Sequence, residues 1–183
     1  MSKQSIRAVV VSAILLAAPA LHARTSVLAA APQSATVDAK TVEFTRKKAE
    51  ENNLVAQFNM GVYCEKGLGT PLDMATARSW YQKASDQGHA MSQFNLAVMH
   101  LVGNGGPKDV QAAIKYLTLA GEQGYAPAQN NLAIMYEEGT GVAKNAKAAF
   151  SWYLKAAEGG SVVSQVALGS MYRTGRGTER DFV

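Results

Sequence analysis

The sequence predicts an all-α protein, an α-solenoid of helix-loop-helix repeats that are each 36 residues long. Similar residues recur at this interval without a single insertion, and each interval carries two helical stripes of apolar and small residues. All 16 glycines lie at or after Gly61, and eleven of them occupy three repeating positions. One helix pair cannot bury its apolar face alone, so such repeats are expected to stack into a continuous core.

Four kinds of residue carry the 36-residue period. The first helix of each unit contains a glutamine: Gln57, Gln93, Gln129 and Gln165. A Gly-x-Gly pair follows that helix: Gly67 and Gly69, Gly103 and Gly105, Gly139 and Gly141, Gly175 and Gly177. The second helix is preceded by Asp73, Asp109, Asn145 and Asp181, and the unit ends at Gly88, Gly124 and Gly160. The glycines are typical of helix C-caps and the Asp and Asn residues of N-caps, which predicts a structural role for them. The identical glutamines suggest a packing or hydrogen-bonding role that is repeated in every unit.

The beginning of the chain has the pattern of a secretory signal peptide. Two basic residues precede an apolar stretch of 11 residues, and a proline and small residues follow it. This order predicts a signal peptide over 1–23 and a flexible leader over 24–36. Ala20 and Ala30 are alternative cleavage positions to Ala23, and an uncleaved anchoring helix is the other interpretation. We therefore expect an exported protein.

The remaining elements follow in order from the repeat. A half-repeat helix over 37–52 is expected to cap the N-terminal end, with Thr41, Phe44 and Lys48 at the core positions. Whole repeats are expected over 53–88, 89–124 and 125–160, and an incomplete fourth repeat over 161–183. The fourth unit stops where its second helix begins, which fits either a truncated chain or an intended end.

Two different stripes distinguish the helices of each repeat. The first helix carries apolar or small residues at i, i+4, i+5 and i+8, such as Ala56, Met60, Gly61 and Cys64. The second carries them at i, i+3, i+4 and i+7, such as Ala149, Trp152, Tyr153 and Ala156. Both spacings place the residues on one helix face. Trp152 is expected to be buried, so that Trp152→Ala destabilises the array severely.

These motifs resemble the Sel-one-like repeat (SLR), a relative of the tetratricopeptide repeat. Residues 56–61, 80–84, 128–142 and 151–160 carry the resemblance, which covers about residues 53–183. A period of 36 residues favours the SLR type over the tetratricopeptide period of about 34. The resemblance implies a scaffold for protein–protein interaction of the bacterial secreted or periplasmic type. Cysteine-rich SLR proteins linked to β-lactams carry paired cysteines, which this sequence lacks.

Composition and residue pattern exclude several classes of protein. Apolar residues make up 48% of the chain, too many for a disordered protein, and the single cysteine cannot form an internal disulfide. The formal charge is +4, and Lys3 and Arg7 leave with the signal peptide, so no nucleic-acid partner is expected. The histidines (His22, His89, His100) have no metal-ligand spacing, and the Gly-x-Gly pairs lack the context of a dinucleotide fingerprint.

The sequence therefore predicts no catalytic residue, cofactor or metal, and a non-enzymatic adaptor in envelope signalling, assembly or host contact. An envelope enzyme acting on cell-wall material is the alternative. The expected partner is another protein, bound on the repeat surface, with no membrane span after signal cleavage and an undecided oligomeric state.

Five residues that differ between repeats are candidates for contact with this partner. Phe58, Phe94 and Leu101 are hypothesised to form an apolar anchor in a polar groove, the usual composition of an interaction hot spot. Asn130 and Glu137 lie in the same two rows of the repeat. The alternative is that these side chains only pack between repeats.

Overall fold

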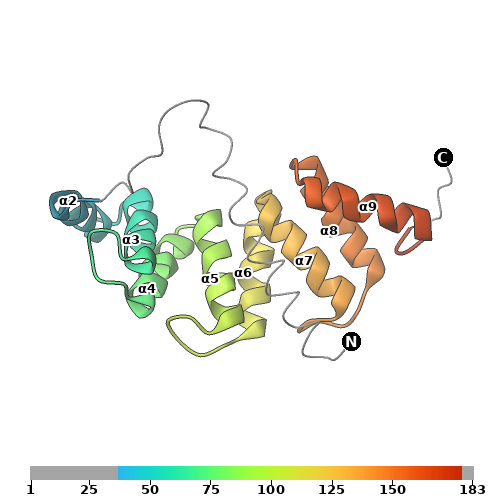
Figure 1. The fold of residues 1–183 in the computed structure, drawn as a ribbon, viewed down its shortest axis with the longest axis horizontal. Helices are drawn as coiled ribbons and strands as arrows, with labels where there is room; N and C mark the ends of the chain where they lie inside the picture. Colours follow the sequence, from blue (N-terminus) through green and yellow to red (C-terminus); the bar gives the residue numbers. More distant parts are fainter. Residues whose placement is uncertain (1–36, 179–183) are drawn as a thin grey trace.

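The computed structural model describes residues 37–178, which form eight α-helices and no strand (Figure 1). The helices are α2 Ala39–Glu50, α3 Leu54–Lys66, α4 Met74–Asp86, α5 Ala90–Val102, α6 Val110–Glu122, α7 Ala126–Glu138, α8 Ala146–Glu158 and α9 Val162–Thr174. The expected signal peptide, the leader and the N-cap residue Asp181 lie outside the described residues. Over the described part the predicted α-solenoid is confirmed.

The helices stack in chain order along the long axis of the molecule, from α2 at one end to α9 at the other (Figure 1). Extensive contacts join only helices that are neighbours in the sequence. We call α3, α5, α7 and α9 the first helices and α2, α4, α6 and α8 the second helices. None of the helices between residues 37 and 178 has both the length and the apolarity needed to span a membrane.

The predicted caps delimit the helices. The first helices end at Gly67, Gly103, Gly139 and Gly175, all in the left-handed conformation. Asp73 begins α4, where its carboxylate accepts hydrogen bonds from the backbone N–H groups of Ala75 and Thr76 at 3.0 Å. The second glycine of each pair also lets two units approach. A Cβ added at Gly105 would clash with the carbonyl oxygen of Met74, because this loop lies on the N-terminus of the preceding second helix.

The core positions agree with most of the predicted stripes, and the exceptions Tyr116, Tyr136 and Trp152 are half-buried. Ala56, Met60, Gly61 and Cys64 of α3 are all buried. Burial raises the pKa of the Cys64 thiol, in keeping with its expected role as a small core residue.

Trp152 departs from the expectation of full burial. Its ring packs against Gly121 of α6 and lies under the exposed Lys155 side chain, whose Nζ is 4.4 Å from the ring centroid. Part of the indole therefore stays in contact with water, whereas Trp80, its counterpart in the first repeat, is buried.

The half-repeat helix α2 is present, but its predicted core positions are wrong. Its buried residues are Val42, Thr45 and Ala49, whereas Phe44 is 64% exposed. In a complete repeat the position of Phe44 faces the unit's own first helix and the preceding unit, and neither is present among the described residues. The loop after α2 also differs, because Asn52 takes the left-handed conformation (φ 64°) that Gly88 takes one period later.

Candidate partner-binding surface

Three of the five predicted partner-binding residues lie inside the solenoid. Phe94 and Leu101 are only 3% and 6% exposed. The Phe94 ring meets the Tyr125 ring edge-on at a centroid distance of 5.4 Å. Asn130 is buried, and its Oδ1 accepts a hydrogen bond of 2.9 Å from the Ser164 hydroxyl. These contacts join neighbouring units, as expected for residues that pack between repeats.

The other two residues, Phe58 and Glu137, are half-buried and make contacts within the chain. Phe58 lies with its ring centroid 4.8 Å from the His89 ring. Glu137 accepts a hydrogen bond of 2.7 Å from the Tyr153 hydroxyl and forms an ion pair with Arg176. The structure therefore favours the alternative of packing between repeats, and a partner-binding role for all five residues stays a prediction.

The four repeated glutamines hold each first helix to the second helix before it. Their Nε2 atoms donate to carbonyl oxygens eight residues earlier, those of Ala49, Ser85, Gly121 and Ala157. A second amide completes this network in two units, because Gln87 donates to Gln57 and Gln123 donates to Gln93, each at 2.7 Å. The next residue in that row is Gly159. Gln129 Oε1 is consequently buried without a partner among the described residues.

A buried tyrosine–glutamate pair recurs in the first and third repeats. The Tyr81 hydroxyl donates to Glu65 at 2.5 Å, and the Asn95 side chain interacts with the same hydroxyl. Burial and the Glu65 carboxylate raise the pKa of Tyr81 far above its usual range, so the phenol stays protonated and acts as a donor.

The second repeat replaces both members of this pair with leucine, Leu117 and Leu101. Asn131, one period after Asn95, is fully buried, and neither polar atom of its side chain finds a partner within residues 37–178. The second repeat thus exchanges a hydrogen-bonded pair for an apolar one and leaves an amide unsatisfied.

The exposed apolar residues gather on the first helices. Of the eleven large apolar residues exposed in the described part, seven belong to these helices: Val55, Met91, Val102, Val162, Val163, Val166 and Tyr172. Val55, Met91 and Val163 share one repeat position, and Val62, Val98 and Ile134 lie half-buried two turns further along the same helix face. This face was not predicted from the sequence, although its signal is the row of apolar residues one position before the core stripe.

No cluster of three or more His, Cys, Asp or Glu residues able to hold a metal ion occurs between residues 37 and 178. His100 lies beside Arg78, with Nδ1 2.7 Å from the guanidinium, and its ring stacks on Tyr116. Arginine can only donate, so His100 accepts and is neutral. Burial, and secondarily the Arg78 charge, lowers the pKa of His100, which agrees with a packed histidine.

Comparison with known proteins matches most of the chain to one family. The family model described as Sel1 repeat matches residues 54–89, 90–125, 126–161 and 162–183. The crystal structure of a protective antigen of uropathogenic Escherichia coli strains, which has an SLR fold, is 39% identical with a TM-score of 0.75 over 78% of this chain. That of a Sel1 repeat protein from Oxalobacter formigenes is 34% identical with a TM-score of 0.73, also over 78% of this chain.

The curated relative is similar over a shorter stretch. The chitin synthase regulator SKT5 of Malassezia restricta is 38% identical over 53 residues, which is 29% of this chain. The present chain spans 4% of that regulator, 30% of the Escherichia coli protein and 57% of the Oxalobacter protein.

Proposed function

This chain belongs to the Sel1 repeat family, and we propose that it is an exported, non-enzymatic adaptor that binds another protein on the surface of its first helices. Stacked helical repeats generally serve as scaffolds for protein interactions, because the rows of equivalent residues form an extended binding surface. The observation that carries the proposal is the set of exposed apolar residues on α3, α5 and α9, among which Val55, Met91 and Val163 share one repeat position. Exposed apolar patches of this kind mark interaction sites on soluble proteins.

Two further observations support export to the cell envelope or beyond. The pattern over residues 1–23 is that of a signal peptide. The similar Escherichia coli protein is a protective antigen, and a protective antigen has to be met by the immune system of the host. Cell fractionation and N-terminal sequencing of the mature chain test this part, with Arg24 as the expected first residue. A chain that stays in the cytoplasm with residues 1–23 attached would contradict it.

Site-specific photo-crosslinking in living cells tests the binding surface. A photoreactive amino acid replaces Met91 on a first helix or, as the matched control, Leu119 on a second helix, whose exposed fractions are 36% and 38%. We expect a discrete crosslinked partner from position 91 and none from position 119. Equal crosslinking from both positions, or none from either, would refute an adaptor that works through its first helices.

A further inference from the structure

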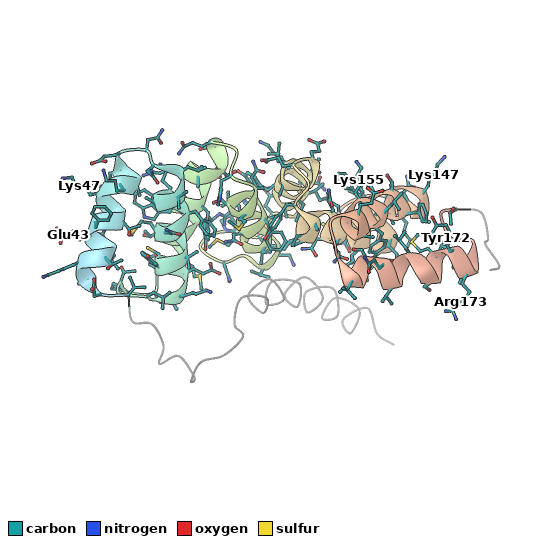
Figure 2. All side chains as sticks on the ribbon, turned by 90° about the horizontal axis from the view of Figure 1, so that it is seen from above. Glu43, Lys47, Lys147, Lys155, Tyr172 and Arg173 are labelled. Carbon is teal, nitrogen blue, oxygen red and sulfur yellow. The ribbon has the colours of Figure 1, made fainter. Side chains whose placement is uncertain are left out.

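The first helices differ from the second helices in where they carry charge. The first eleven residues of each first helix, over 54–64, 90–100, 126–136 and 162–172, contain no Lys, Arg, Asp or Glu. The second helices carry charges along their whole length, and Lys47, Lys147 and Lys155 lie along one side of the molecule in Figure 2. The charges of the first helices stand in their last turn, at residues such as Lys66 and Glu138.

The charge-free part includes the exposed apolar face. Val55 and Val163 are 59% and 63% exposed, and Met91 occupies the same position in the second repeat. Val98 and Ile134 lie on the same face, half-buried. The first helices follow one another along the solenoid (Figure 1), and we call the set of these residues the first-helix surface.

This composition is that of the centre of an interface and not of its rim. Interface centres are depleted in charged residues, because an unpaired charge loses its hydration when it is buried. A charged partner segment would find no counter-charge on the first-helix surface until it reached Lys66 or Glu138 at the helix ends. An uncharged apolar segment loses no ionic hydration there, and its apolar area adds to that of Val55, Met91 and Val163.

We propose that the first-helix surface binds an uncharged, apolar segment of a partner protein, a statement that rests on the function proposed above. Charged residues in the last turns of α3, α7 and α9, such as Lys66 and Glu138, form a polar rim beside this segment. Binding that depends on apolar contact is insensitive to salt, because no ion pair is screened.

A selection of peptides by the whole chain tests the chemistry of the partner. Immobilised protein selects from a phage library of random twelve-residue peptides, and the Kd of a synthesised winner is measured at low and high NaCl. We expect winners poor in charged residues, with Kd changing less than about twofold over the salt range. Met91→Lys and Val55→Lys, both at exposed positions, should weaken binding at least tenfold. Leu119→Lys on the second-helix side should leave it unchanged.

Each other outcome overturns the proposal. Winners rich in acidic or basic residues, a Kd that rises steeply with salt, or no enrichment at all would show that the surface does not select apolar segments. Binding to phosphatidylcholine vesicles in place of peptides would identify a lipid surface. A dimer that Met91→Lys dissociates would identify a second copy of the chain as the occupant. A partner crosslinked at position 91 through a charged segment would overturn this proposal alone, whereas the absence of any crosslink would remove the adaptor function itself.

Discussion

Replacing Gly159 with glutamine is expected to stabilise the protein by completing a hydrogen-bond network that two other units already have. Gln87 and Gln123, one and two periods earlier in the chain, donate to Gln57 and Gln93 at 2.7 Å. Gly159 has a φ of −74°, close to the −80° of Gln123, so a side chain fits the backbone without strain. The new amide would reach Gln129 Oε1, which is buried without a partner in the described part of the chain.

The size of the effect follows from two gains and one cost. Satisfying a buried acceptor is worth about 1 kcal/mol, and removing a glycine from a compatible position adds about 0.4–1 kcal/mol through the unfolded state. Against this, an added Cβ would lie 3.0 Å from the Ala126 Cβ, so that methyl group has to move by a few tenths of an ångström. We expect a net gain of about 1 kcal/mol, which raises the Tm of a domain this size by about 2–4 °C.

Urea and thermal unfolding followed by circular dichroism measure this gain. Gly159→Ala is the matched control, because it changes the backbone and adds the Cβ without supplying the amide. Gly160→Ala is a second control, for backbone strain at the neighbouring residue. Its φ is 86°, and nothing lies within 4 Å of an added Cβ. Backbone strain alone should make that variant less stable by about 1 kcal/mol. If Gly159→Gln proves no more stable than Gly159→Ala, the amide does not complete the network and the reasoning from repeat to repeat is refuted.

Three further predictions use the same unfolding measurements. Asn131→Leu should raise the unfolding midpoint, since it removes a buried amide without partners. Asn95→Leu should lower the midpoint, because it breaks the contact with Tyr81. A loss of stability in both variants would contradict this. Burial lowers the pKa of both His89 and His100, so the unfolded chain binds more protons and stability should fall as pH drops below about 6.5; a profile in His100→Gln as steep as in the parent would exclude His100 as a source. Trp80→Ala should cost about 3–5 kcal/mol and more than Trp152→Ala, since only Trp80 is buried; equal losses would contradict that order.

The sequence pattern was sufficient to predict the length of the repeat, the two helices in each unit and the residues that cap them. A period without insertions makes every unit a copy of the same contacts, so Asp73 and Gly67 could be assigned as caps from spacing alone. The four identical glutamines suggested a packing or hydrogen-bonding role repeated in every unit, and each makes an equivalent hydrogen bond to the carbonyl oxygen eight residues earlier.

The sequence pattern was less informative where a residue depends on what lies beyond its own repeat. Phe44 occupies an aromatic core position in the pattern, yet no preceding helix among the described residues covers it. Phe94 and Leu101 were chosen as partner anchors because they vary between units. Variation also arises when a buried pair changes together, as Leu101 and Leu117 do in place of the Glu65–Tyr81 pair. Sequence spacing alone does not distinguish these two causes.

The candidate surface was missed because its row of apolar residues is a weak signal in any single helix. An isolated valine or methionine on a helix is unremarkable, and surface apolar residues are common in soluble proteins. Only the structure shows that Val55, Met91 and Val163, which share one repeat position, are all exposed. The missing charges over the first three turns of each first helix then distinguish this face from the rest of the solenoid.

Extensive contacts join only helices that are neighbours in the sequence, so the described fold can form from local contacts. No described helix has to wait for a distant segment, because each docks extensively only on the helices just before and just after it. Proteins whose contacts are local fold quickly, since little loop-closure entropy is lost before the contacts form. Such a chain can assemble unit by unit as it emerges from a ribosome or a membrane channel, and each new helix covers the apolar face left by the one before.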